Sequence, residues 1–492
     1  MSKRLLGGTA FAVMLAGSEV AVTLIASPAV RPAEGVPAFA RQYDLQCNVC
    51  HTRPPRLNSF GEQFHLMGFQ LPSAARPDGL LGSLREDGPV KTLIDSLAVR
   101  AVGGIFEYSE SPRETEWKLA PPDEIEFFIA RALTPDLSLY VELEYEPNGV
   151  SFSRTRGYFT TSKFGLGKEG FFMLNLGGLF GPLGAPTMEM GGMTMVGRHG
   201  GFNMHGPMLM AGKVDPSTNF SYATNRQLIL DTEAEVEREP GATRGEIHRL
   251  PVVPYAFASK YFGLFKNRDD GEPQLVTDQV MYNTRGSYGA DFHAMFQNNL
   301  LLGQVGFLSE NEGFNVYGVA RLDLGERRGF TFNVSALFNW GFGVVRAPFI
   351  DPDDPAEIRP SDRRLDRLRY GLAANARWKG LDVYGAVIWD RVYGLPRELD
   401  RVFDRNAAGL TLEVDYLAFE TVMLSTRFDQ LWAGGLKDQK ADGSVFTAQV
   451  RYYPWQNIAF FIRDSVNLRE FREENPLRSW RNQVFVGIDW DF

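Results

Sequence analysis

The chain ends on the stretch Gln483-Val484-Phe485-Val486-Gly487-Ile488-Asp489-Trp490-Asp491-Phe492, in which apolar and polar side chains alternate. Successive side chains of a β-strand point to opposite faces, so this order sorts them into two groups. One face carries Val484, Val486, Ile488, Trp490 and Phe492. The other carries Gln483, Gly487, Asp489 and Asp491. The stretch therefore predicts a strand with an apolar surface on one side and a polar surface on the other.

The same period of two recurs through much of the chain upstream. Clear runs cover residues 137–146, 330–340 and 369–378, and further strands fit near 93–106, 124–134, 286–297, 314–324, 381–391, 408–416, 421–431, 444–453 and 457–468. Aromatic residues stand at the ends of several apolar faces, and the intervening turns are rich in Gly, Asp, Asn and Pro. After the N-terminal region no run of about 18 apolar residues exists, so the pattern predicts no membrane-spanning helix.

Segments of this kind are typical of a β-barrel that crosses a membrane with its apolar faces outward. We predict a mainly β fold, with a roughly 16-stranded transmembrane antiparallel β-barrel over residues 89–492. The final strand, which closes on a phenylalanine, also resembles the signal that the bacterial outer-membrane assembly machinery reads. A soluble β-sandwich would instead have to bury one face of both sheets and hide their edges.

Charged residues on the inward faces of these strands predict a water-filled lumen. The inward residues are Arg321, Arg377, Arg427, Arg451 and Arg463, with Glu413, Asp415 and Asp429 as acids. The whole chain carries a net charge of −9, from 60 acidic and 51 basic residues. This balance gives no electrostatic support to nucleic-acid binding, so we expect none.

The N-terminal residues predict export. A basic start, Met1-Ser2-Lys3-Arg4, precedes a mostly apolar run that ends in small residues near Pro28. This order is typical of a secretory signal peptide, which we place over residues 1–29.

The two cysteines of the chain both lie in the stretch Cys47-Asn48-Val49-Cys50-His51. The pattern C-x-x-C-H is the attachment signature of a c-type haem, in which two thiols bond one porphyrin and the next imidazole binds its iron. A thioredoxin-like dithiol or half of a zinc site would need surroundings that the sequence does not show. We therefore predict one covalent haem c in a small cytochrome segment over residues 30–88, which would plug the lumen.

A short helix after the haem motif offers ligands for the sixth position of the iron. Asn58 or Ser59 would cap its N-terminus, and Phe60, Phe64 and Met67 would share one face. Met67 is the candidate distal ligand on that face, and His65 is the alternative, pointing elsewhere. A donor from the barrel wall, such as His293 or Met295, or a water molecule also remains open.

A second stretch rich in soft donors lies inside the predicted barrel. Seven of the 14 methionines fall between Met188 and Met210, together with His199 and His205. Thioethers and imidazoles suit Cu(I). Their irregular spacing favours the simpler interpretation, a glycine-rich loop in the lumen with methionine as adaptable filler.

The haem segment resembles a known family. The pattern Phe39-Ala40-Arg41-Gln42, Cys47-x-x-Cys50-His51, Pro55-x-Leu57, Phe60-Gly61-x-x-Phe64 and Gly68 is similar to that of fused monohaem cytochrome–porins of the bacterial outer membrane, of which the best known are iron oxidases. The resemblance implies that Cys47 and Cys50 hold the haem and that His51 ligates its iron. This chain departs from the family at His65, where a lysine is common, and in its Met/His-rich stretch.

The expected function follows from these features. We expect an outer-membrane electron conduit that oxidises an extracellular donor, most plausibly Fe(II), and passes electrons to a periplasmic c-type cytochrome. Lipid of the outer membrane would surround the barrel, with the haem segment in its lumen or at its periplasmic mouth. Two alternatives stay open: a porin that a redox cytochrome plugs or gates, and a conduit for another donor such as copper. The sequence shows no acid–base or nucleophilic apparatus.

Overall fold

The structure is a computed structural model of the whole chain. It describes residues 38–43, 45–54, 56–58, 60–61, 64, 79–110, 115–119, 124–134, 137–145, 154–158, 163–167, 170–175, 187–190, 193–198, 201–202, 208–213, 220, 265–267, 273–275, 289–296, 300–310, 313–327, 330–350, 358–400, 403–432, 435–436, 443–455, 457–468 and 481–491. The expected signal peptide lies outside these residues, as do His65, Met67 and Phe492.

A few short helices precede and interrupt a long series of strands. The helices are α2 (Ala38–Tyr43), α3 (Cys47–Cys50), α5 (Gly79–Glu86), α6 (Gly88–Ile94) and α9 (Arg397–Asp400). The strands of the first half are β1 (His51–Arg53), β2 (Arg56–Leu57), β3 (Leu97–Glu110), β4 (Thr115–Leu119), β5 (Glu124–Thr134), β6 (Leu137–Tyr145), β7 (Arg154–Tyr158), β8 (Lys163–Gly167), β9 (Gly170–Asn175), β10 (Thr187–Met190), β11 (Met193–Arg198), β12 (Gly201–Phe202) and β13 (Met208–Lys213). Those of the second half are β14 (Phe265–Asn267), β15 (Pro273–Leu275), β16 (Gly289–Phe296), β17 (Leu301–Glu310), β18 (Gly313–Arg327), β19 (Phe330–Ile350), β20 (Ile358–Trp378), β21 (Leu381–Tyr393), β22 (Phe403–Asp404), β23 (Asn406–Phe419), β24 (Val422–Trp432), β25 (Gly435–Leu436), β26 (Gly443–Trp455), β27 (Ile458–Asn467) and β28 (Asn482–Asp491).

The long strands form one closed antiparallel barrel, as predicted. Its order is β13-β16-β17-β18-β19-β20-β21-β23-β24-β26-β27-β28-β3-β4-β5-β6-β9. Strands β4 and β5 pair with successive parts of β3, so they act as one interrupted strand. Counted in that way, the described strands give sixteen positions around the ring, in agreement with the predicted size. Pairing of β28 with β3 joins the two ends of the barrel sequence and leaves no open edge there.

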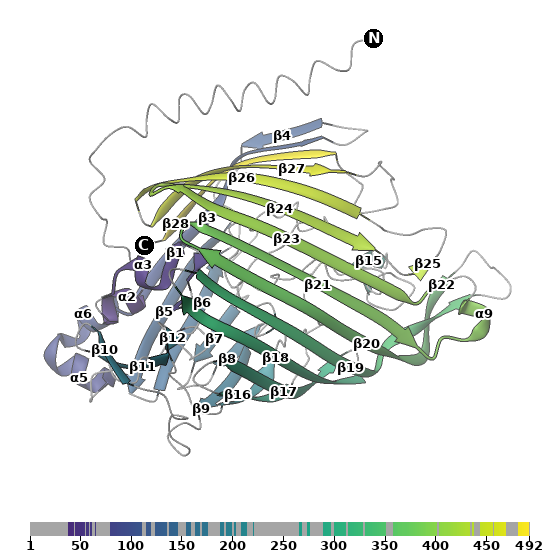
Figure 1. The fold of residues 1–492 in the computed structure, drawn as a ribbon, viewed down its shortest axis with the longest axis horizontal. Helices are drawn as coiled ribbons and strands as arrows, with labels where there is room; N and C mark the ends of the chain where they lie inside the picture. Colours follow the sequence, from purple (N-terminus) through teal and green to yellow (C-terminus); the bar gives the residue numbers. More distant parts are fainter. Residues whose placement is uncertain are drawn as a thin grey trace, which may run out of the picture.

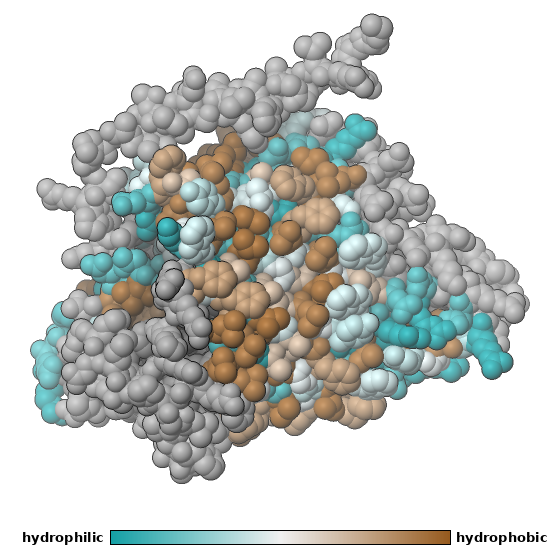
Figure 2. Space-filling model, in the orientation of Figure 1, coloured by the Kyte–Doolittle hydropathy of each residue, from teal (hydrophilic) through white to brown (hydrophobic). Residues whose placement is uncertain are grey.

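Side chains alternate between the two surfaces of the barrel as the sequence pattern predicts. Along β19, Asn333, Ser335 and Asn339 are buried, while Phe330 and Phe338 are exposed. Apolar side chains gather over the outer wall of the strands in Figure 2. A closed barrel with an apolar exterior and a polar interior is the arrangement of a membrane-spanning β-barrel, because lipid solvates the outer side chains.

Ion pairs link the inward-facing side chains. Asp489 accepts hydrogen bonds from Arg100 Nε at 3.0 Å and from Arg451 at 2.5 Å, so it ties β28 to β3 and β26. Arg369 makes a two-pronged contact with Asp390 at 2.7 and 2.6 Å. The five arginines predicted to face inward, Arg321, Arg377, Arg427, Arg451 and Arg463, are all buried, as are Glu413, Asp415 and Asp429. The predicted polar lumen is therefore confirmed.

The two ends of the barrel differ. At one end short turns join β18 to β19, β20 to β21, β23 to β24 and β26 to β27. Longer connections join β19 to β20, β21 to β23, β24 to β26 and β27 to β28 at the other end, where β17 and β18 are separated by only two residues. Exposed aromatic residues stand near the short-turn end, as an interfacial girdle requires: Phe330, Trp378, Phe419, Trp455 and Trp490.

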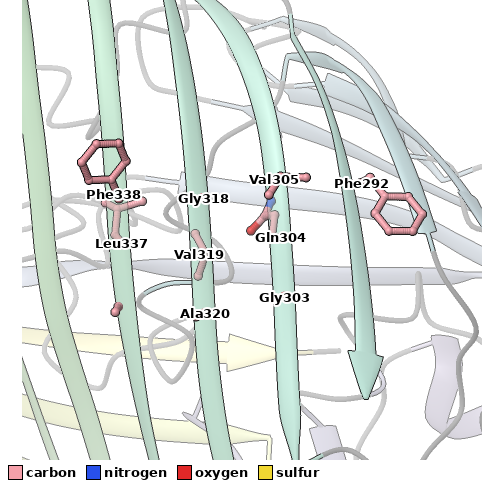
Figure 3. Close-up of a pocket in the computed structure, with 10 residues that line it drawn as sticks. Phe292, Gly303, Gln304, Val305, Gly318, Val319, Ala320, Leu337 and Phe338 are labelled. Carbon is pink, nitrogen blue, oxygen red and sulfur yellow. The ribbon is translucent and has the colours of Figure 1, made fainter.

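Figure 3 shows a hollow in this outer wall, where small residues leave space between larger ones. Gly303, Gly318 and Ala320 lie between Phe292, Val305 and Phe338. The hollow is on the lipid-facing side, so it would take acyl chains. In the described part of the chain, no helix is long and apolar enough to cross a membrane.

The first barrel strand begins later than predicted. The strand expected from residue 93 starts at Leu97, because residues 88–94 form helix α6. Helix α6 begins with Gly88, whose φ is +79°, and Pro89. These two residues end the helical course of α5 and start a new helix.

Candidate cofactor site

The two cysteines lie on one helical turn. Helix α3 runs from Cys47 to Cys50, and the backbone of His51 then turns to an extended conformation. Cys47 is buried, and both residues are present as thiols. Burial raises the pKa of the Cys50 thiol to about 12, and the neighbouring Cys47 adds to the shift. Cys50 therefore stays protonated at neutral pH.

Asn58 holds this turn in place. Its Nδ2 donates to the carbonyl oxygens of Asn48 and Val49 at 3.1 and 3.0 Å, and its backbone N–H donates to Cys50 O at 2.9 Å. Its Oδ1 accepts a hydrogen bond of 2.9 Å from the backbone N–H of Gly61. This last bond has the geometry of the N-cap that the sequence predicted at Asn58 or Ser59, because the amide of Gly61 lies three residues after Asn58. Asn58 thus joins the cysteine turn to the helix that follows.

An aromatic cluster joins residues of α2 to residues that follow Asn58. Phe64 lies at its centre, edge-on to Phe39 and Tyr43 with ring centroids at 5.4 and 5.7 Å, and stacked with Phe60 at 6.3 Å. Tyr43, Phe60 and Phe64 are buried. The predicted pairing of Phe60 and Phe64 on one face is confirmed, and the cluster forms an apolar wall against which a porphyrin could pack.

These residues fit the chemistry of a c-type haem. Within five residues the chain presents two thiols and an imidazole, and buried aromatic rings lie on both sides of this stretch in the sequence. A zinc site would need more ligands nearby. In the described ranges, no group of three or more His, Cys, Asp or Glu side chains is placed to hold a metal ion. Thioether attachment needs only two thiols and one axial ligand from this stretch.

Several bonds fasten the segment to the short-turn end of the barrel. Arg53 Nε donates to the carbonyl oxygen of Glu420, in the turn between β23 and β24, at 2.8 Å. Tyr453, buried on the inner face of β26, donates its hydroxyl to Pro54 O at 2.7 Å. Ala38 packs against Ala98 and Phe128. Figure 1 shows α2 and α3 at the same end of the barrel as the C-terminus.

Only some of the other predicted ligands lie among the described residues. Met67 and His65 lie outside the described residues, so their distal role stays a prediction. His293 is buried on β16, and its Nδ1 lies 3.1 Å from Asp291 Oδ1. Asp291 also accepts hydrogen bonds from Gln304 and Tyr317, each at 2.9 Å. His293 is thus part of a polar cluster in the wall. Met295 lies on the same strand.

The described residues of the Met/His-rich stretch form short strands, and the predicted loop lies partly outside the described residues. Strands β10 and β11 pair so that Met188 lies opposite Met195 and Met190 opposite Met193. Strand β13 belongs to the barrel and sets Met208 opposite His293. His199 and His205 lie outside the described residues. A role in copper binding stays a hypothesis.

Comparisons with known proteins give a fold likeness at low identity. No family model matches the chain, and no curated protein matches it. Among solved structures, OmpF of Salmonella typhi in complex with daunomycin has a TM-score of 0.43 and 11% identity, over 80% of this chain and 97% of that one. An anion-selective porin from Comamonas acidovorans has a TM-score of 0.42 and 9% identity, over 80% and 98%. A loop-deletion mutant of OmpT from Vibrio cholerae has a TM-score of 0.41 and 5% identity, over 80% and 98%.

Proposed function

We propose that this protein is an outer-membrane electron conduit with one covalent haem c at the periplasmic mouth of its barrel. The observation that carries the proposal is the Cys47–His51 turn, held by Asn58 and fastened to the barrel rim through Arg53 and Tyr453. If the turn holds a haem, these bonds would keep that haem at a fixed place relative to a membrane-spanning wall. This is what a protein that moves electrons across a membrane requires.

The orientation of the barrel supports the location. Bacterial outer-membrane barrels place short turns on the periplasmic side and longer loops outside the cell. The haem segment contacts the short-turn end, through Glu420 of one such turn and through Leu97 at the start of β3. It would therefore plug the periplasmic mouth, within reach of a periplasmic c-type cytochrome.

The side chains of the segment have separate tasks. Cys47 and Cys50 would hold the haem, and His51 would ligate its iron. Phe60, Phe64 and their neighbours would exclude water from one side of the porphyrin. When bound, the haem would supply one-electron chemistry between external Fe(II) and the periplasmic carrier.

The polar lumen suits an ionic donor that enters from outside. Its wall carries paired charges such as Asp489 with Arg100 and Arg451, and Arg369 with Asp390, so an ion inside the barrel would meet polar side chains and not an apolar layer. The same lumen would also serve a porin gated by its cytochrome. Ion conductance that changes with haem redox state would favour that second function.

The first test is whether the haem is present and needed. Protein purified from a host that attaches c-type haem should show one haem adduct by intact mass. The protein is then inserted in vesicles that enclose an oxidised c-type cytochrome. External Fe(II) should reduce this enclosed cytochrome. The Cys47→Ala/Cys50→Ala variant should assemble as a barrel but lose both the adduct and the reduction. A wild-type protein without an adduct, or a double variant that still transfers electrons, would contradict the proposal.

A further inference from the structure

Helix α6 exposes its apolar side chains, and polar side chains on its other side are buried. A helix that packs on protein with one face and meets water with the other shows the opposite arrangement. Val90, Leu93 and Ile94 are 70%, 56% and 55% exposed. Thr92 and Ser96, on the opposite side, are buried at 3% and 5%. The apolar residues recur at spacings of three and four, so they form one continuous stripe. Amphipathicity of this inverted kind indicates that the exposed side meets an apolar medium.

The buried side of this segment covers a charged residue on the outer wall of the barrel. Arg131 Nη1 donates to the carbonyl oxygen of Thr92 at 3.1 Å and to Ser96 Oγ at 3.0 Å. Phe127, four residues before Arg131 on β5, is exposed on the outer wall, and the pairing of β5 with β6 is regular between them. Arg131 therefore belongs to the lipid-facing row of β5. Without α6 this arginine would face lipid, which is costly.

The apolar stripe of α6 continues into the lipid-facing surface. Leu97, the first residue of β3, is exposed and pairs with Ile129, on the outward row that also holds Phe127. From the other side, Arg41 of α2 donates to the carbonyl oxygens of Ile94 and Leu97 and so fixes the junction between α6 and β3. Burial lowers the pKa of Arg41, and Asp95 partly offsets this shift.

The charged residues of α6 lie at its flank. Lys91 forms ion pairs with Asp95 at 2.7 Å and with Asp87 at 3.8 Å, and more than half of its side chain is exposed. Charged residues beside an apolar stripe are typical of a helix that lies in the membrane interface, where they keep their charged ends in water. Figure 1 shows α5 and α6 at the short-turn end, where such an interface would lie.

We propose that α6 is an interfacial helix, whose stripe of Val90, Leu93 and Ile94 contacts the acyl chains of the periplasmic leaflet while its polar face shields Arg131. The occupant of this surface is phospholipid. The helix would thereby anchor the haem segment at the level of the membrane. The inference depends on the barrel and not on the haem, so it can fail while the proposed function holds.

Photocrosslinking tests the contact with lipid directly. A diazirine-bearing residue is placed at position 93, at position 91 as the matched exposed control, and at position 127 as the lipid-facing reference. Full-length protein is reconstituted in vesicles of phosphatidylethanolamine and phosphatidylglycerol, irradiated, and analysed by mass for phospholipid adducts. The adduct at position 93 should approach that at position 127 and exceed that at position 91 about fivefold or more.

Two results would overturn the proposal. One is an adduct at position 93 that is no stronger than at position 91. The other is irradiation in cells that joins position 93 to a periplasmic protein instead of phospholipid, because α6 would then be a protein-docking surface. The position 127 control shows in each case that the barrel is inserted.

Discussion

Removal of the Asn58 side chain should loosen the cysteine turn without disturbing the barrel. Asn58→Ala removes three hydrogen bonds, two from Nδ2 to the carbonyls of Asn48 and Val49 and one from the Gly61 amide to Oδ1. Each contributes about 0.5–1.5 kcal/mol net, and these bonds are partly exposed to solvent. We expect the opening of this segment to become easier by about 2 kcal/mol, which corresponds to about 30-fold faster amide exchange at Gly61.

A second variant separates the two roles of this side chain. Asn58→Ser keeps an oxygen that can cap the Gly61 amide but has no amide to hold Asn48 and Val49. It should therefore lose about 1 kcal/mol, and exchange should rise about fivefold. Hydrogen exchange read by mass spectrometry on peptides over residues 45–61 measures both changes, with β19 and β20 peptides as the internal control.

The result that would refute this reasoning is specific. Equal exchange in the wild type and Asn58→Ala would show that the turn does not depend on Asn58. Faster exchange across the barrel peptides as well would show a global effect, and the local assignment would be wrong. If Asn58→Ser behaves as Asn58→Ala does, the N-cap contributes nothing and the link to the turn carries the whole effect.

Three further predictions address the barrel, the thiols and the iron. Asp489→Asn removes a charged hydrogen-bond partner of two buried arginines, so it should destabilise the barrel by about 3 kcal/mol, seen as a lower urea midpoint, whereas an unchanged midpoint would argue against a buried charge network. In haem-free protein at pH 8, the thiolate fraction of Cys50 should be about a thousandfold smaller than that of a thiol of pKa 9.0, because its own pKa is raised to about 12. Alkylation by iodoacetamide should therefore be slow at pH 8 and speed up as the pH rises toward 12, and fast alkylation at pH 8 would contradict the raised pKa. If Met67 is the distal ligand, Met67→Leu should shift the haem reduction potential downward and remove any thioether-to-iron charge-transfer band, and an unchanged spectrum would leave the barrel wall, His65 or water.

The barrel strands could be predicted from the sequence because their two faces lie in different environments. Lipid outside and polar side chains inside force a period of two, and Phe338 beside Asn339 shows this contrast within adjacent positions. The start of β3 could not be predicted in the same way. Leu93 and Ile94 read as the beginning of a strand, but they are the exposed stripe of α6. From the sequence alone, an apolar residue that faces lipid from a helix cannot be told from one that faces lipid from a strand.

The site shows the same division between local and distant information. The haem motif and the cap at Asn58 are local, since their partners lie within a few residues. The bond from Asn58 Nδ2 back to Val49 depends on the intervening hairpin of β1 and β2. The bond from Arg53 to Glu420 joins residues 367 positions apart, and no sequence pattern in one chain indicates it. The attachment of the haem segment to the barrel rim therefore could not be predicted from the sequence and is seen only in the structure.

The most direct test of the account is stopped-flow reduction of the purified haem-loaded protein by Fe(II), Cu(I) and an organic donor, side by side. An electron conduit for iron predicts rapid reduction of the haem by Fe(II), followed by transfer to an added c-type cytochrome. Faster reduction by Cu(I) would move the assignment of the donor to copper. Haem that none of the donors reduces, in a barrel whose ion conductance changes with redox state, would contradict the conduit and establish a gated porin.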